Sequence, residues 1–534
     1  MWLFKFIFPL FIISCNGGGG AGSSSSSESV GTWKVSGLLS YDYVPATSSG
    51  LDYSAIIQKP MRNIYVEVVR TVDQKVIATG PTDDNGNYSF EIPSIAQNNP
   101  IKLAVWAEMK SPSVIIKDNT SNNAKYVAYS DVYELNAEGE TIIEEINAPS
   151  GWGVGNVYST KRVAAPFAIL DSIYSAVQKV KAVKPSISFP QLKVNWSTLN
   201  VATSGAISLG QIGTSHYNGE TGELYILGKE GADTDEYDPH IIVHEWGHYF
   251  EDKLSRSDSG GGQHSEGETV EMSLAFSEGW SNALSAIVLD PDIVLKDTSG
   301  FRQGTTGIIF SLETSTDIKP GWFSEVSNQQ MIFDVYDSNA DTGDTLSLGL
   351  GPILDVLTDY MKTTPAKTTI FSFVAGLKAA NPSSVSALNT LTLNKQITNV
   401  ADDFGTGETN NGGLARMLPV YNSLAINGSA VSVFMGGGIA RMNEADNNRY
   451  YRFTATSAST KVSWTSTDTY IIRVMRLGKV IYETAEEATD ASVLGPLYHM
   501  VTTTPGLEYV IQVSTHPDYV FNTSNPIEFS AGLN

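Results

Sequence analysis

The sequence predicts a multidomain protein in which two β-sandwiches flank a central α+β domain. A chain of 534 residues is too long to fold around one hydrophobic core. Residues 32–150 and 426–534 both consist of short stretches rich in β-branched and aromatic residues, which is typical of strands. Residues 151–425 contain longer stretches with apolar residues at helical spacing, and strands precede several of them.

The composition indicates a globular protein with a strongly acidic surface. Hydrophobic residues make up 41% of the chain, which is enough for cores of ordinary size. The 57 acidic residues against 34 basic ones give a net charge of -23, which would repel nucleic-acid phosphates and anionic membrane surfaces. We therefore expect no nucleic-acid partner, and we interpret the charge as a source of solubility.

Residues 1–15 are typical of a signal peptide. They combine one early lysine with an apolar run too short to span a bilayer, and they end at Cys15, the only cysteine of the chain. The four residues ending at Cys15 resemble a bacterial lipobox, which implies that Cys15 is lipidated and becomes the mature N-terminus. An ordinary cleaved signal peptide is the alternative.

Residues 16–31 are rich in glycine and serine and predict a flexible tether after the lipidated cysteine. We therefore expect an extracytoplasmic protein of the cell envelope, anchored to a membrane through the lipid on Cys15. Asn16 stands where an aspartate would favour inner-membrane retention in Gram-negative lipoproteins, so the lipobox resemblance implies the outer membrane or the cell surface.

Residues 32–150 predict the first β-sandwich. Partly alternating stretches such as NIYVEVVRT and KLAVWAEM indicate strands, and Asn85-Gly86 predicts a tight turn before a further strand. The stretch from Thr82 to Pro93, TDDNGNYSFEIP, resembles carboxypeptidase-regulatory-like and transthyretin-like sandwiches. Any immunoglobulin-like hairpin could produce the same stretch, so that alternative stays open.

Residues 151–425 predict the α+β domain. Pro166 stands near the start of a helical stretch, whose apolar stripe comprises Phe167, Leu170, Ile173, Tyr174, Val177 and Val180. Strand-like LKVNW and HYNGETGELYILG follow. Further helical stretches then dominate, namely VEMSLAFSEGWSNALSAIV, SNQQMIFDVYDS and LGPILDVLTDYMK.

Residues 426–534 predict the second β-sandwich. Four strand-like stretches carry the prediction, namely RYYRFTA, TKVSWTS, YIIRVMRLG and EYVIQVSTH. This tail resembles the pre-peptidase C-terminal domains that follow secreted bacterial peptidases.

The stretch DPHIIVHEWGHYFEDKL, residues 238–254, predicts a metal site. Asp238 is a good N-cap and Pro239 suits the first helical position, so the helix should begin just ahead of the histidines. His244 and His248, four residues apart, share one helical face and can both bind one zinc ion. Glu245 lies beside that face, where a general base can reach a water on the metal.

The alternative is a core helix with incidental histidines. The apolar residues of the stretch are expected to pack in any case, and His240 has no place in the motif. The chain has only seven histidines, however, so two of them bracketing a glutamate at this spacing favours the zinc site.

A catalytic zinc ion normally has three protein ligands, so the motif needs a third. Here the sequence resembles the gluzincin clan, the thermolysin-like zinc peptidases, over about residues 210–340. The resemblance implies a zincin-like metallopeptidase domain with Glu278, 30 residues after His248, as third ligand. It also places Asn282 where the family has an aspartate that orients a ligand histidine. An amide can accept the same hydrogen bond without bringing a charge.

Other residues could supply the third ligand or the groups around it. The rival ligands are His264, Glu266, Glu268 and Glu271. His264 and Tyr336 are also the candidates for stabilising the oxyanion of the reaction. Their alternatives are a solvated loop residue for His264 and helix packing for Tyr336.

Two acidic stretches favour a structural interpretation. Residues 337–344, DSNADTGD, have oxygen ligands at alternate positions, but the glycine is one place late for a calcium loop. Residues 231–239, GADTDEYDP, are interpreted as a solvated loop that ends in a helix cap. Either stretch could bind calcium, but the structural interpretation is favoured at both.

Together these features predict a lipid-anchored zinc metallopeptidase, an endopeptidase that hydrolyses peptide or protein substrates. A surface binding or adhesion lipoprotein with an inactive peptidase-like domain is the alternative, and the two sandwiches and Asn282 favour it. A hydrolase with a non-peptide substrate is a third possibility. The sequence predicts neither subsite preference nor oligomeric state.

Overall fold

A computed structural model describes residues 32–47, 49–93, 99–134, 141–265, 267–289, 294–297, 308–337, 345–398, 400–414, 416–434, 443–465, 470–484, 497–515 and 528–533. Cys15, the tether at 16–31, Glu266 and all but the first residue of the stretch 337–344 lie outside these residues. Within the described ranges, no helix is both long and apolar enough to cross a bilayer.

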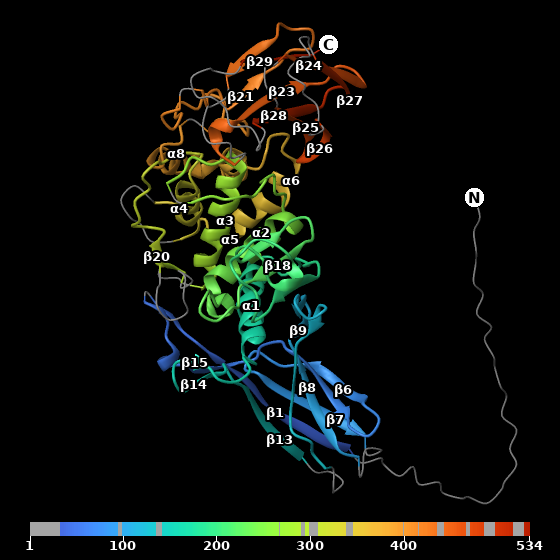
Figure 1. Cartoon of the computed structure of the whole chain (residues 1–534). Coiled ribbons are helices and arrows are strands. Elements are labelled where there is room, and N and C mark those ends of the chain that lie inside the picture. The colour runs from blue at the N-terminus through green and yellow to red at the C-terminus, as the bar shows by residue number, and fades with distance from the viewer. Residues whose placement is uncertain are drawn as a thin grey trace, which may run out of the picture.

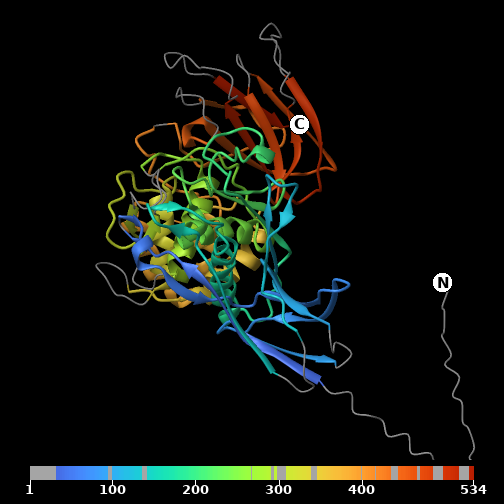
Figure 2. The same ribbon diagram turned by 60° about the horizontal axis from the view of Figure 1, so that its bottom comes forward.

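The molecule is elongated, with β-sheets at both ends and the helices between them (Figure 1). When the molecule is turned, the last strands of the chain lie at the top, and the blue strands of its start extend from the helical part toward the bottom (Figure 2). Many sheets together with several helices agree with the predicted multidomain α+β class.

Two four-stranded sheets form the N-terminal end. In the first, β1 (Thr32–Tyr43) pairs in parallel with β13 (Thr141–Ala148) and antiparallel with β4 (Ile57–Pro60) and β7 (Asn87–Pro93). The second has the order β12 (Val127–Tyr129), β8 (Ile101–Trp106), β5 (Tyr65–Arg70) and β6 (Lys75–Pro81). Alternate residues of β1 and β5 are buried in one hydrophobic core, as a sandwich requires.

The predicted turn between β6 and β7 is present. Gly86 has a φ of 80°, and a Cβ added to it would lie 2.4 Å from the carbonyl oxygen of Leu39. Only glycine fits this turn without strain. Two short ladders complete the region, β2 (Ala46–Thr47) with β3 (Gly50–Leu51) and β14 (Trp152–Gly153) with β15 (Val157–Tyr158).

A third sheet joins the first predicted domain to the second. Its order is β11 (Ala124–Lys125), β10 (Ser113–Asp118), β16 (Leu192–Trp196), β18 (Glu223–Ile226) and β17 (His216–Asn218), and β9 (Glu108–Lys110) also pairs with β10. The link is the parallel pairing of β10 with β16. The boundary predicted at residue 150 therefore does not separate the sheets, because strands from both sides of it share this one.

The predicted helices are confirmed, and the first two of them contact this third sheet. Their bounds are α1 (Ala165–Val183), α2 (Pro239–Leu254), α3 (Met272–Leu289), α4 (Glu325–Tyr336), α5 (Leu350–Asp355), the π-helix η5 (Val356–Tyr360), α6 (Met361–Thr363), α7 (Ile370–Ala380) and α8 (Val385–Asn394). The predicted apolar stripe of α1 is buried along its whole length. A small hairpin, β19 (Val294–Asp297) with β20 (Ile308–Ser311), follows α3.

Two further sheets form the C-terminal sandwich. One has the order β21 (Tyr421–Ser423), β23 (Asn448–Thr454), β28 (Glu508–Thr515), β25 (Tyr470–Arg476) and β26 (Lys479–Glu483). The other has the order β22 (Val431–Phe434), β29 (Glu528–Leu533), β24 (Ser459–Thr465) and β27 (Leu497–Thr502). Side chains from both sheets, among them Val462 and Ile511, form a hydrophobic core of their own. The four predicted strands are all present.

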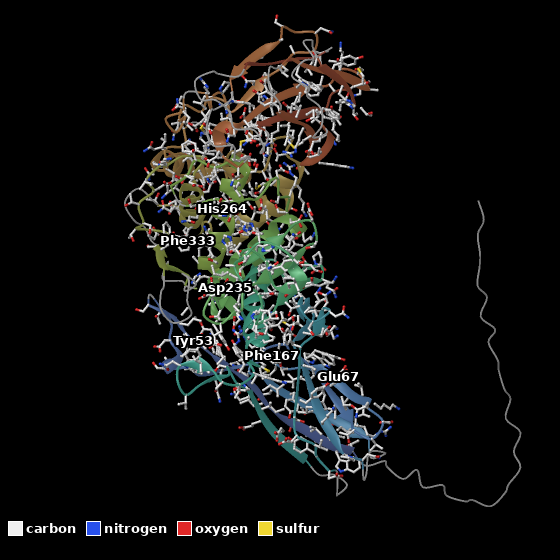
Figure 3. All side chains as sticks on the ribbon, in the orientation of Figure 1. Tyr53, Glu67, Phe167, Asp235, His264 and Phe333 are labelled. Atoms are coloured by element: carbon white, nitrogen blue, oxygen red, sulfur yellow. The ribbon has the colours of Figure 1, made fainter. Side chains whose placement is uncertain are left out.

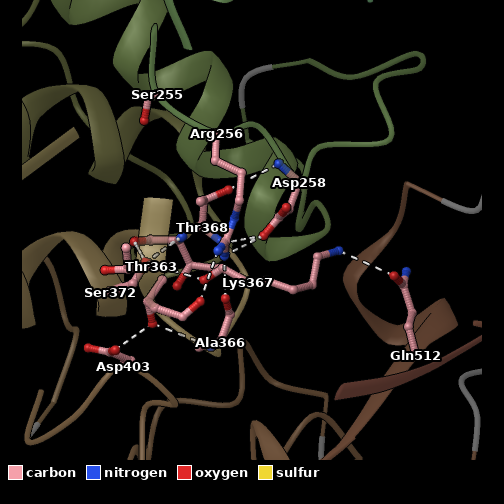
Figure 4. Close-up of polar contacts among 12 residues, drawn as sticks. Ser255, Arg256, Asp258, Thr363, Ala366, Lys367, Thr368, Ser372, Asp403 and Gln512 are labelled. Carbon is pink, nitrogen blue, oxygen red and sulfur yellow. Dashed lines mark hydrogen bonds and ion pairs between the residues drawn. The ribbon is translucent and has the colours of Figure 1, made fainter. Parts of the chain in front are cut away.

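A buried polar contact fixes this sandwich to the helices. The Nζ of Lys367 donates to Glu271 Oε1 at 2.9 Å. It also donates to Gln512 Oε1 of β28 at 3.3 Å (Figure 4). Tyr450 of β23 donates to the same oxygen of Glu271. The other oxygen, Glu271 Oε2, accepts from the backbone N–H groups at the start of α3. Glu271 therefore caps α3 and joins it to the sandwich.

Candidate metal centre

Helix α2 begins at Pro239, as the sequence predicts, and carries the motif residues. Its apolar residues, among them Trp246 and Phe250, are buried and anchor the helix in the core. Asp238 occupies the N-cap position, but its side chain makes no capping hydrogen bond, so the predicted aspartate cap is absent. The proline at the first helical position and the buried apolar face therefore determine where α2 lies.

The structure brings His244, His248 and Glu278 together as a group that could hold a metal ion. The Nε2 atoms of the two histidines are 3.1 Å apart. Oε2 of Glu278, from α3, lies 3.2 Å from Nε2 of His244 and 3.4 Å from Nε2 of His248. Three electron-rich atoms from two helices thus converge on one point.

These separations of 3.1–3.4 Å are close to those between the ligands of a tetrahedral zinc ion, two of them slightly shorter. Ligand atoms about 2.0–2.2 Å from a tetrahedral ion are about 3.3–3.6 Å from one another. Oε2 of Glu278 is buried and has no hydrogen-bond partner among the described residues. Such an oxygen is costly to bury unless a cation or a proton faces it. Two imidazoles and one carboxylate are also a donor set that zinc accepts.

The outer nitrogens of both histidines are occupied, which turns the inner ones toward the group. Nδ1 of His244 lies 2.7 Å from Oδ1 of Asn282. Nδ1 of His248 lies 3.0 Å from the hydroxyl of Ser277 and 3.2 Å from that of Ser281. Because the amide oxygen of Asn282 can only accept, it holds the proton of His244 on Nδ1 and leaves Nε2 as a lone-pair donor.

The charges within the group are strongly coupled. Burial lowers the pKa of His248, but the carboxylate of Glu278 outweighs it and raises this pKa to about 9. Burial would raise the pKa of Glu278, yet His248 holds it well below its usual range. The group therefore favours a positive charge at its centre.

Glu245 lies next to this group and outside it, as the motif predicts. Glu245 is buried, and its Oε2 accepts a 2.7 Å hydrogen bond from the backbone N–H of Tyr217 in β17. Both Glu245 and the metal-binding group line a cleft of about 1120 Å³. The edge strand β17 and the loop 257–264 form other parts of its wall.

His264, which Figure 3 labels in the helical part of the molecule, belongs to the loop before α3 and also lines the cleft. Its Nδ1 lies 2.8 Å from Oε2 of Glu325, and its Nε2 lies 3.4 Å from Oε1 of Glu278. Burial lowers the pKa of His264, but Glu325 and Glu278 outweigh it and raise the pKa to about 9. His264 thus faces the outer oxygen of Glu278 and is not part of the three-residue group.

The structure does not bring Tyr336 to the cleft. Tyr336 is the last residue of α4, and its hydroxyl accepts a 2.9 Å hydrogen bond from Lys179 of α1. Its ring contacts Phe333, which is the packing role that the sequence left open. Of the rival ligands, Glu271 caps α3 and Glu268 does not line the cleft.

The prediction that residues 231–239 form a solvated loop is wrong. Asp235 to Tyr237 form a short 3-10 helix, η4, and all three residues are buried. Asp238 is buried as well. The acidic composition suggested exposure, whereas packing against α1 and the start of α2 encloses the segment.

Several residues around the site were not predicted from the sequence. Ser277 and Ser281 directly precede Glu278 and Asn282 on α3, and their four-residue spacing, which places both on one helical face, is the signal that could have indicated them. Glu325 and the backbone of Tyr217 come from distant parts of the chain, and no sequence signal marks them.

Comparisons with known proteins leave the family open. No family model and no curated protein matches the sequence. The pre-peptidase C-terminal domain of a Bacillus anthracis collagenase is similar at 11% identity and a TM-score of 0.16, over 21% of this chain and 94% of that one. A 9R-lipoxygenase from Cyanothece is similar at 15% identity and a TM-score of 0.14, over 32% of this chain and 27% of that one. At these TM-scores, neither likeness assigns a function to the chain.

Proposed function

We propose that this chain is a zinc metallopeptidase in which His244, His248 and Glu278 hold the ion and Glu245 is the general base. The observation that carries the proposal is the convergence of three ligand atoms, 3.1–3.4 Å apart, beside Glu245 in an open cleft. A structural zinc site would have no need of a neighbouring carboxylate or of a cleft.

Each side chain has a distinct task in the proposed reaction. Zinc, when bound, supplies Lewis acidity that acidifies a nucleophilic water and polarises a carbonyl. Glu245 takes the proton of this water and passes it to the leaving amine. Its second oxygen, Oε1, makes no hydrogen bond with the described residues and is available for this transfer. His264, on the cleft wall, is the candidate donor to the developing oxyanion.

The cleft supports a polymeric substrate. Its volume of about 1120 Å³ exceeds the range of about 300–1,000 Å³ that is usual for small-molecule pockets. The edge strand β17 borders it, and an extended peptide can pair with such an edge. We therefore favour a peptide or protein substrate. The enzyme would be anchored through Cys15 and would cleave this substrate outside the cytoplasm.

The test is Glu245→Gln, with zinc content, folding and cleavage of an unfolded protein substrate as measurements. The amide can still accept from Tyr217, so we expect the variant to fold and to hold zinc. Loss of the base should slow cleavage by about 100- to 10,000-fold. Glu220→Gln makes the same change on the exposed rim of the cleft and should remain active.

The contrary result would favour the binding lipoprotein. If the zinc-loaded wild type cleaves no member of a broad peptide library, the peptidase proposal fails. If Glu245→Gln also retains the biological activity of the wild type, the metal is structural and the sandwiches carry the binding function.

A further inference from the structure

A second group of acidic side chains lies just ahead of α2. Asp233, Asp235 and Asp238 each offer a carboxylate oxygen, and these oxygens lie within 4.8 Å of one another. Asp238 is six residues before His244, which corresponds to about 9 Å along a helix. The group is thus separate from the His244, His248 and Glu278 group.

Asp235 has one buried oxygen that accepts no hydrogen bond from the described residues. Only 2% of the residue is exposed. Its Oδ2 accepts a hydrogen bond from the hydroxyl of Ser215, whereas its Oδ1 is buried without a hydrogen-bond partner among the described residues. Oδ1 is therefore the oxygen of Asp235 that is available to bind a cation together with Asp233 and Asp238. A buried carboxylate oxygen in this state is costly unless a cation faces it.

The mutual repulsion of the three carboxylates also favours a bound cation. Asp238 is as deeply buried as Asp235, so solvent screens their charges only weakly. Burial, followed by the charges of Asp233 and Asp238, raises the pKa of Asp235 well above its usual value. A cation among the three oxygens would remove the repulsion.

We propose that Asp233, Asp235 and Asp238 bind a calcium ion that holds the start of α2 in place. The donors are all oxygens, which suits a hard cation and disfavours zinc. Calcium tolerates irregular arrangements of six to eight oxygens, whereas magnesium demands a near-octahedral shell with several waters. Asp233 is partly exposed, so water can complete the shell from that side.

The position of the ion gives it a structural consequence. Figure 3 shows Asp235 between His264 and Tyr53 of the N-terminal region. Burial, and after it the charge of Asp238, raises the pKa of Tyr43 in β1 to about 12, so Asp238 lies close to the N-terminal sandwich. Calcium would fix the segment between β18 and α2, the helix that carries His244 and His248, where this segment approaches the sandwich. The inference does not depend on peptidase activity.

The experiment measures calcium binding to the metal-stripped full chain. Calcium should raise the melting temperature by about 5–10 °C at 100 times its Kd, and magnesium at the same concentration should raise it less. Terbium should show emission sensitised by Tyr237 and Trp196, and calcium should displace it. The same responses are expected in a His244→Ala, His248→Ala background, which removes the other metal-binding group.

Two aspartate variants make the test specific. Asp235→Asn keeps the acceptor for Ser215 and should abolish the calcium shift and the terbium emission. Asp258→Asn is the matched control, because the Asp258 side chain is also buried with an unpartnered Oδ1, but it pairs with Arg256 at 2.9 Å. The control should leave the calcium shift unchanged.

Three results would overturn the proposal. An absent calcium response in the wild type, with Asp235→Asn more stable than the wild type, would mean that the carboxylates share a proton instead. An equal response in Asp235→Asn would place the ion elsewhere. An equal response to magnesium would exclude calcium as the preferred ion.

Discussion

A Cβ added to Gly247 would lie 2.9 Å from the Cα of Ser281, so α2 and α3 meet backbone to backbone beside the metal-binding group. Ser281 in turn contacts Nδ1 of His248 at 3.2 Å. The small residue at 247 therefore fixes the separation of the two helices that carry the proposed ligands.

Gly247→Ala should destabilise the protein and weaken zinc binding. The methyl group would force α3 away from α2, at a cost of about 1–3 kcal/mol in the free energy of unfolding. Urea unfolding and zinc competition would measure the two effects. Gly351→Ala in α5 is the control, because a Cβ there meets nothing within 4 Å and alanine favours the helix. Equal stability of the two variants would contradict the close approach.

Glu278→Ala should lose zinc, whereas His264→Ala should keep it. Glu278 Oε2 converges with both histidine Nε2 atoms, but His264 faces the opposite oxygen of Glu278 and is held by Glu325. Metal analysis of both purified variants gives the answer, with about one zinc per chain expected in the wild type. The reverse pattern would remove Glu278 as the third ligand.

Asn282→Ala should weaken zinc binding by about 10- to 100-fold, because the partner that orients His244 is lost. Asn282→Asp should bind zinc at least as well as the wild type. The amide of Gln329, which now accepts from Asn282 at 2.7 Å, can turn to donate to the new carboxylate. Competition with a zinc-binding dye measures both affinities. Unchanged affinity in Asn282→Ala would show that His244 needs no such partner.

Removal of zinc should lower the melting temperature of the wild type. Zinc at 100 times its Kd contributes about 2.7 kcal/mol to the stability of the state that binds it. A thermal scan with a zinc-selective chelator measures this loss of stability. Excess calcium in the buffer keeps the proposed calcium site occupied, so that only zinc is removed. A His244→Ala, His248→Ala variant should not respond to the chelator, and a response there would indicate zinc bound at another place.

Cys15→Ser should release the protein from the membrane fraction. One acyl-anchored terminus followed by the tether at 16–31 needs no membrane-spanning helix. Fractionation of cells that express the wild type and the variant would measure the change. A variant that stays with the membrane would exclude the lipid on Cys15 as the anchor.

Local patterns in the sequence predict most of the elements around the site. The apolar stripe of α1 and the start of α2 at Pro239 follow from side-chain spacing and local backbone preference, which act over a few residues. The grouping of His244 with His248 is also local, since four residues make about one helical turn. Glu278 is predicted only through a family resemblance, and the structure brings it to the same group.

Contacts between distant segments could not be predicted in the same way. Glu325 reaches His264 across 61 residues, and β10 pairs with β16 across a longer separation. The burial of Asp235 depends on packing against α1, which no local pattern encodes. The acidic composition of the segment suggested a solvated loop, because acidic residues are exposed in most proteins. Such an average does not predict the contacts of one particular segment.

The pairing of β10 with β16 also has a consequence for fragments of this protein. A fragment beginning at residue 151 would leave β16 with an open edge, and open edges invite aggregation. We therefore expect the first 150 residues and the helical region to express and fold together as one unit.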